Sequence, residues 1–158
     1  MELISRYNNI TKEQGGHCMD LGLQGKVAIV TGASKGIGFC TALQLVKEGA
    51  LVTICARGEK SLQVAAASIK KETGIDVLTI AANMAKEEDC KEVIEKTVER
   101  YGRLDILINN AGTASANSFE QVSSELWQTD LDLKLFGAVN CSKYAVPHLK
   151  EAGSGSIV

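Results

Sequence analysis

The chain has 158 residues, of which 45% are hydrophobic and 23% charged, a balance that is typical of one globular domain and excludes a disordered or fibrous protein. Lys and Arg together number 17 and Asp and Glu 19, so the formal net charge of -2 gives no electrostatic reason to bind nucleic acid. The five cysteines show no C-x-x-C spacing and no apolar run approaches the roughly 20 residues that span a bilayer, so we expect a cytoplasmic protein with no disulfide, no metal and no membrane partner.

The first part of the chain, residues 1–20, is polar and shows no sustained hydrophobic period. Such a segment has no apolar face to bury, so it predicts a flexible N-terminal tail. Met19 offers an alternative start to Met1, because the residues that follow it lead directly into the first apolar run. The remaining residues, 21–158, are predicted to form the folded part of the chain.

Short apolar runs alternate with helical periodicity along the rest of the chain. The apolar runs, which are typical of strands buried on both faces, lie at 27–30, 51–55, 77–80, 104–108 and 155–158. The helical patterns lie at 39–46, 62–69, 90–101 and about 124–149. This alternation predicts right-handed βαβ units and therefore a three-layer α/β fold with a doubly wound parallel sheet. The sequence stops inside the last apolar run, so we expect a sheet that is truncated after the start of its fifth strand.

A glycine-rich segment, Thr31 to Gly38, joins the first predicted strand to the first predicted helix. Glycines in this context let backbone N–H groups approach a phosphate, and the start of the helix adds partial positive charge. The spacing is G-x-x-x-G-x-G, and no Gly-Lys-Ser/Thr follows, so this is not a P-loop. The segment predicts a dinucleotide site, with a ligand-free glycine-rich connection as the alternative.

Two basic residues favour NADP over NAD. NAD-binding sites of this type usually place an acidic residue roughly 20 residues after the glycine loop, where it binds the ribose. The second predicted strand instead leads into Arg57, whose guanidinium could pair with a 2′-phosphate, and Lys35 could approach the same group. The alternative is that both are solvated loop charges.

These motifs, together with the segment Asn109-Asn110-Ala111-Gly112 after the fourth predicted strand, resemble the short-chain dehydrogenase/reductase family. Residues 102–105 and the positions of Trp127, Asp132 and Gly137 on the long helix match the same pattern. The resemblance covers residues 26–158. It implies a Rossmann-type fold, a nicotinamide cofactor, reversible oxidation of an alcohol to a carbonyl, and a homo-oligomer for a complete chain. The cofactor-binding residues that it implies are Gly32, Ser34, Lys35, Gly36, Ile37, Gly38, Arg57, Asn83, Met84, Asn110, Ala111 and Gly112.

The sequence departs from the family pattern at two matched positions. Asn83 stands where the family usually has an aspartate that bonds the adenine amino group; its side-chain carbonyl can still accept that hydrogen bond. Lys134 stands where the family has an asparagine that helps to hold a proton-relay water. Lys134 could donate to such a water, or it could simply point to solvent.

The family's catalytic serine and its Tyr-x-x-x-Lys motif have no match in these 158 residues. Tyr7, Tyr101 and Tyr144 are followed four residues later by Thr, Asp and His, so no catalytic residue is intact. We therefore expect an inactive, cofactor-binding fragment of an NADP(H)-preferring reductase. The substrate in a full-length relative would be a small carbonyl or alcohol, such as a 3-oxoacyl thioester or a ketone. The alternatives are a catalytically silent nucleotide-binding module and the product of a truncated gene.

Overall fold

The computed structural model describes residues 21–113 and 118–158, so the prediction of a flexible tail over 1–20 lies outside the described residues. In chain order the elements are β1 (Val27–Thr31), α2 (Gly36–Lys47), β2 (Leu51–Ala56), α3 (Glu59–Thr73), β3 (Leu78–Ala81), α4 (Glu87–Tyr101), β4 (Ile106–Ile108), the short 3₁₀ helix η1 (Phe119–Gln121), α5 (Ser124–Leu131), η2 (Asp132–Phe136), α6 (Gly137–Glu151) and β5 (Ser156–Ile157). The predicted alternation of strands and helices is therefore present.

The five strands form one parallel sheet in the order β3-β2-β1-β4-β5. Strand β1 is central: Ala28 pairs with Val52 of β2 on one side and with Ile106 of β4 on the other. The chain order reverses between β1 and β4, and ligands of such sheets bind beside the carboxyl ends of the strands at that point. The predicted doubly wound α/β fold is confirmed.

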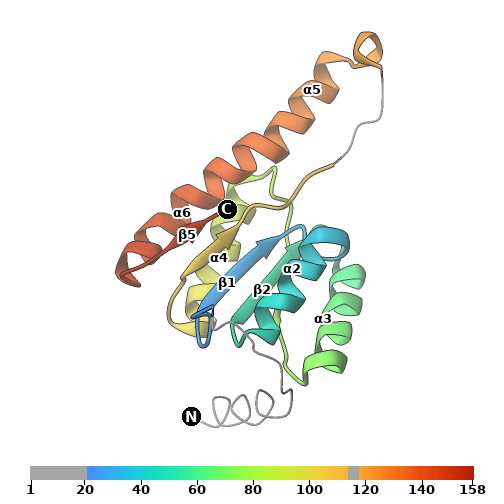
Figure 1. Cartoon of the computed structure of the whole chain (residues 1–158). Helices are drawn as coiled ribbons and strands as arrows, with labels where there is room; N and C mark the ends of the chain where they lie inside the picture. The colour runs from blue at the N-terminus through green and yellow to red at the C-terminus, as the bar shows by residue number, and fades with distance from the viewer. Residues whose placement is uncertain (1–20, 114–117) are drawn as a thin grey trace.

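Helices cover both faces of this sheet, and β1 supplies side chains to both cores. Val27 and Ile29 are buried against α4 and α6, whereas Ala28 and Val30 are buried against α2 and α3. Both faces of a central parallel strand lie inside the protein, which explains why β1 is apolar at successive positions rather than at alternate ones. Figure 1 shows α2 and α3 together on one side of the sheet.

The predicted long helix is helical from Ser124 to Glu151, but it contains a π-helical turn, η2, between α5 and α6. A π turn takes up extra residues, and a pattern based on 3.6 residues per turn does not reveal it. The part before this turn, α5, has no buried residue and projects beyond the sheet (Figure 1). No helix within residues 21–113 and 118–158 is both long and apolar enough to cross a membrane.

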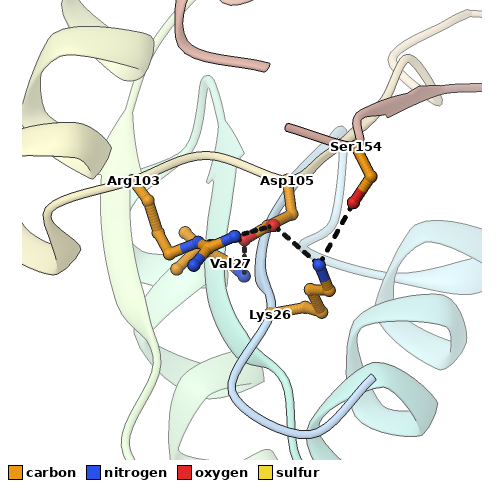
Figure 2. Close-up of polar contacts among 5 residues, drawn as sticks. All are labelled: Lys26, Val27, Arg103, Asp105 and Ser154. Atoms are coloured by element: carbon orange, nitrogen blue, oxygen red, sulfur yellow. Dashed lines mark hydrogen bonds and ion pairs between the residues drawn. The ribbon is translucent and has the colours of Figure 1, made fainter. Parts of the chain in front are cut away.

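At the amino ends of the strands, the buried carboxylate of Asp105 connects the segments that precede β1 and β4, and the Lys26 ammonium also donates to the Ser154 hydroxyl at 3.4 Å (Figure 2). The Asp105 carboxylate accepts hydrogen bonds from the backbone N–H of Val27 at 3.0 Å, from the Lys26 ammonium at 3.1 Å and from two nitrogens of Arg103 at 2.6 and 2.8 Å. Burial raises the pKa of this carboxyl, but the bonds from Arg103, Val27 and Lys26 outweigh burial and hold the pKa below its usual value. This cluster fixes the end of the sheet opposite to the candidate site.

Candidate functional site

A cavity of about 340 Å³ lies where the strands β1 to β4 end. Its walls come from the segments that follow these four strands and from η2. The residues that line it are Gly32, Ser34, Lys35, Ala56, Arg57, Gly58, Ser61, Ala82, Met84, Ala111, Gly112 and Leu133. The cavity therefore lies beside the point where the strand order reverses, which is the expected place for a ligand.

Two glycines of the segment Thr31 to Gly38 are required by close packing. Gly32 has a φ of +67°, and a Cβ at this position would lie 2.8 Å from the Cα of Ala111. A Cβ on Gly38 would collide with the side-chain nitrogen of Asn110 and lie 2.8 Å from the carbonyl oxygen of Gly32. Larger residues would push the glycine segment away from the segment after β4, so these glycines keep the two segments in contact.

The hydroxyl of Thr31 holds the same two segments together. It accepts hydrogen bonds from the backbone N–H groups of Asn110 and Ala111, both at 2.9 Å, and donates to the carbonyl of Ile108 at 3.2 Å. The side-chain amide of Asn110 in turn donates to the carbonyls of Thr31 at 2.8 Å and Gly32 at 3.3 Å. The two glycine-containing motifs thus form one hydrogen-bonded unit, which we call the Thr31–Asn110 bridge.

The start of α2 lies at the rim of this cavity and is suited to an anion. The helix begins at Gly36, directly after the cavity-lining Lys35, with no side-chain cap and no acidic residue in its first turn. The first N–H groups of a helix have no partner within the helix, and its dipole places partial positive charge there. Backbone and dipole therefore both favour a phosphate at this end of the cavity.

The side chains around the cavity add positive charge. Its lining residues include the cations Lys35 and Arg57 and no carboxylate. Two hydroxyls, those of Ser34 and Ser61, accompany them, and the Ser61 hydroxyl donates to the carbonyl of Gly58 at 2.7 Å. Both cations follow strands that end at the cavity, so an anionic group bound between them would be attracted by both.

The cavity brings together part of the predicted cofactor-binding set. Seven residues of that set line the cavity: Gly32, Ser34, Lys35, Arg57, Met84, Ala111 and Gly112. The other five lie outside its lining: Gly36, Ile37, Gly38, Asn83 and Asn110. Gly38 and Asn110 pack beneath the loop instead, and the Ile37 side chain is 80% exposed at the start of α2. The Asn83 side-chain oxygen accepts the N–H of Ala85 at 3.3 Å, and one of its lone pairs remains available.

Lys134, at the family's asparagine position, lies in η2 next to Gly112. Its Cε would be 3.8 Å from a Cβ placed on Gly112, and its ammonium donates to Asp130 at 2.7 Å. Asp130 also accepts the Thr113 hydroxyl at 2.9 Å, and these two bonds, that from Lys134 first, lower the pKa of its carboxyl. Lys134 thus does not line the large cavity; its side chain is half-exposed and connects η2 through Asp130 to the segment after β4.

Five lining residues were not predicted: Ala56, Gly58, Ser61, Ala82 and Leu133. Ala56, Gly58 and Ser61 flank Arg57 at the end of β2 and the start of α3. The rule that selected Arg57, its position after a strand that ends at the ligand side, selects these neighbours as well. Leu133 comes from the π-helical turn, for which the sequence offers no signal. Thr31 was noted within the glycine motif, but its bonding role depends on a segment 79 residues away.

Comparison with known proteins agrees with this geometry. A family model described as short chain dehydrogenase matches residues 26–158. The 11-beta-hydroxysteroid dehydrogenase A of Sesamum indicum is 37% identical over 135 residues, which are 85% of this chain and 39% of that protein. The 3-oxoacyl-(acyl-carrier-protein) reductase FabG of Staphylococcus epidermidis is 37% identical over 133 residues, covering 84% of this chain and 54% of that protein.

Solved structures give the same result in three dimensions. L-sorbose reductase from Gluconobacter frateurii, solved with NADPH and L-sorbose, has a TM-score of 0.83 and 39% identity, covering 88% of this chain and 53% of that chain. An NAD⁺-bound xylitol dehydrogenase has a TM-score of 0.80 and 29% identity, covering 85% of this chain and 52% of that chain. The chain thus spans about half the length of most of these relatives.

Proposed function

Because the chain belongs to the short-chain dehydrogenase family, we propose that its cavity binds NADP(H) in preference to NAD(H). The observation that carries the proposal is the charge of the lining: Lys35 and Arg57 at the ends of β1 and β2, and no carboxylate among the lining residues. A 2′-phosphate would be attracted to both cations, whereas the ribose of NAD is usually held by an acidic side chain.

The remaining parts of the cavity fit the rest of such a molecule. The backbone N–H groups of the glycine segment and of the start of α2 would hold the pyrophosphate. Glycine at positions 32 and 38 keeps this wall together, because a Cβ there would push apart the two segments that form it. Met84 would pack beside the adenine half, and Ala111 and Gly112 would line the nicotinamide half. When bound, the cofactor supplies or accepts a hydride.

For the longer protein we propose reduction of a small carbonyl compound or oxidation of a secondary alcohol. The names of the relatives cover a 3-oxoacyl reductase, a sugar reductase and a polyol dehydrogenase, so a ketone or a 3-oxoacyl thioester is the proposed substrate class. We also propose a cytoplasmic location and a homo-oligomer for the complete protein. The free thiols of Cys40, Cys55, Cys90 and Cys141 support a reducing compartment.

A second candidate function, nucleotide binding without turnover, is favoured by the tyrosines of the chain. Reduction of a carbonyl needs a positioned proton donor. Of the described tyrosines, Tyr101 donates to the carbonyl of Val52 and Tyr144 to the carboxylate of Glu87, and neither lines the cavity. The 158 residues contain no Tyr-x-x-x-Lys. We therefore expect this polypeptide to bind the nucleotide and not to turn it over.

A charge reversal at Arg57 tests the cofactor preference. Arg57→Asp removes a charge-assisted contact worth about 1.5–3 kcal/mol, so NADP⁺ binding should weaken about 10- to 100-fold while NAD⁺ binding is retained or improved. Lys60→Asp makes the same charge change three residues further along, outside the cavity lining, and should leave the ratio of the two affinities unchanged. Titration calorimetry with both nucleotides measures these affinities. Equal affinities of the unsubstituted chain for NADP⁺ and NAD⁺ would contradict the proposal.

A further inference from the structure

Ser61 lies at the corner of the large cavity where β2 ends and α3 begins. Four residues of this corner line the cavity: Ala56, Arg57, Gly58 and Ser61. The Ser61 side chain is exposed, and its hydroxyl donates to the carbonyl of Gly58 at 2.7 Å. A hydroxyl therefore lies against the backbone of the residue that directly follows Arg57, one of the two cations to which we assign the 2′-phosphate.

The Gly58 carbonyl does not depend on this hydroxyl. It also accepts the backbone N–H of Leu62 at 3.1 Å. If the Ser61 hydroxyl turned away, the carbonyl would keep that donor, and because Gly58 is exposed, water can supply a second one. The hydroxyl can therefore change its acceptor at little cost. A phosphate oxygen would be the better acceptor, since hydrogen bonds to charged groups are roughly twice as strong as neutral ones.

Glycine at position 58 leaves room for the hydroxyl. A Cβ on Gly58 would lie 2.8 Å from the oxygen of Ser61, which is too close for two atoms that are not bonded. The backbone itself does not require glycine, because its φ of -95° and ψ of 104° belong to the extended region that any residue adopts. Gly58 therefore matters for the space that it leaves to Ser61.

We propose that Ser61 is a specificity-determining residue of the cavity, whose hydroxyl turns from the Gly58 carbonyl to the 2′-phosphate when NADP(H) binds. The inference rests on the proposed preference for NADP(H) and adds a neutral donor to the cations Lys35 and Arg57. Glu59, the acidic residue in the first turn of α3, is not among the lining residues. NAD(H) carries a ribose hydroxyl instead of the phosphate, so it offers Ser61 only a neutral acceptor, no stronger than the carbonyl that Ser61 would give up.

Titration calorimetry on Ser61→Ala measures what the hydroxyl contributes. Exchange of a neutral bond for a charge-assisted one gains about 5-fold in affinity, so the variant should bind NADP⁺ about 5-fold more weakly and NAD⁺ unchanged. Ser61→Thr keeps the hydroxyl and should keep the ratio of the two affinities. If Ser61→Ala weakened NADP⁺ and NAD⁺ equally, or neither, the hydroxyl would have no part in selecting the phosphate and the proposal would be overturned.

The matched control is Ser68→Ala on the same helix. The Ser68 hydroxyl is also exposed and also donates to a backbone carbonyl, that of Val64 at 2.9 Å, but Ser68 lies outside the cavity lining. Ser68→Ala should therefore change neither affinity. A loss of NADP⁺ affinity in Ser68→Ala equal to that in Ser61→Ala would assign the effect to α3 as a whole and overturn the proposal.

Gly58→Ala tests the same contact from its other side. Its Cβ forces the Ser61 oxygen out of place, so NADP⁺ binding should again weaken about 5-fold. Once the hydroxyl is displaced, its removal costs nothing more, so the double variant Gly58→Ala/Ser61→Ala should bind NADP⁺ as tightly as either single variant. An additive loss of about 25-fold in the double variant would show that the two residues act independently, and would overturn the contact.

Salt separates a direct bond from an effect that acts through Arg57. Raising the ionic strength from about 0.05 M to about 0.5 M screens exposed charges, so the loss of NADP⁺ affinity caused by Arg57→Asp should shrink. The loss caused by Ser61→Ala should stay near 5-fold, because the hydroxyl carries no net charge. A Ser61→Ala loss that shrank in step with that of Arg57→Asp would overturn the direct bond.

The proposed function and the role of Ser61 fail in different ways. If the unsubstituted chain binds NADP⁺ and NAD⁺ equally, both are overturned. If the unsubstituted chain prefers NADP⁺ and Arg57→Asp removes that preference while Ser61→Ala leaves it intact, the proposed function stands and the role of Ser61 is overturned.

Discussion

Replacing Asp105 with asparagine keeps the shape of the side chain and removes its charge. The carboxylate accepts four hydrogen bonds, two on each oxygen. In either orientation the asparagine amide turns its NH₂ group toward two of these donors, so two charge-assisted bonds are lost. Each such bond contributes about 1.5–3 kcal/mol.

The donors differ in how well they can find a new partner. The side chains of Lys26 and Arg103 are 31% and 44% exposed and can be rehydrated, whereas the N–H of Val27 is buried and cannot. Rehydration reduces the loss, so we expect Asp105→Asn to lower the free energy of unfolding by about 3 kcal/mol. For an m-value of about 2 kcal/mol/M this moves the urea midpoint at pH 7 down by about 1.5 M.

A matched control is Asp76→Asn, which removes an ion pair of similar length, 2.9 Å to Lys70, between two side chains that are both more than half exposed. Exposed pairs of this kind contribute about 0–1 kcal/mol, so the control midpoint should hardly move. If Asp105→Asn shifted the midpoint no more than Asp76→Asn does, the assignment of the Asp105 carboxylate as the connection between the segments that precede β1 and β4 would be refuted.

Further predictions concern pH, the two loops and catalysis. The pKa of Asp105 is lowered in the folded state. Its contribution to the free energy of unfolding is therefore present above the unfolded pKa of about 3.9 and is lost as the pH falls below it. Urea titrations from about pH 6 to 3 should show a steeper fall of the unfolding free energy for the unsubstituted chain than for Asp105→Asn. Thr31→Val leaves two backbone N–H groups without their acceptor, so it should lower the free energy of unfolding by about 2–4 kcal/mol and weaken NADP⁺ binding. The control Thr53→Val removes a hydrogen bond away from the cavity and should lower stability alone. Urea unfolding measures the stability of both variants, and calorimetry measures their NADP⁺ binding. Gly38→Ala should lower stability by about 1–3 kcal/mol through its contact with Asn110, measured in the same urea assay. Absorbance at 340 nm should show no oxidation of NADPH by the 158-residue chain with a ketone, and turnover there would point to an acid outside Tyr-x-x-x-Lys.

The fold could be predicted because its strongest signals are local. A parallel strand buried on both faces gives an apolar run such as 27–30, and a helix after it gives a 3.6-residue period; both are visible without knowledge of the partner elements. The ends of the strands were predicted less accurately. Strand β4 begins at Ile106 rather than at residue 104, because Leu104 and Asp105 precede its hydrogen-bonded pairing with β1, and the Asp105 side chain bonds to the start of β1. The π-helical turn has no local signal at all.

The site could be predicted only in part, for the same reason. Arg57 and the glycine segment were found because each directly follows an apolar run. The contacts of three buried cysteines with the lining residue Met84 were not, since Cys55, Cys90 and Cys141 belong to three elements that meet only in the folded chain. The sequence suggests reduced thiols scattered along the chain; the fold brings three of them together.

The Thr31–Asn110 bridge has a consequence for how fast a ligand can enter. Its bonds connect two main-chain segments 79 residues apart, and in each of them the donor and the acceptor are both protein atoms. Preorganised walls spare a ligand the entropy of ordering them, and binding that requires no rearrangement of the protein proceeds at rates set mainly by encounter. Stopped-flow mixing with NADP⁺ should therefore show a single binding phase whose rate rises with NADP⁺ concentration, with no slower phase from closure of these two segments.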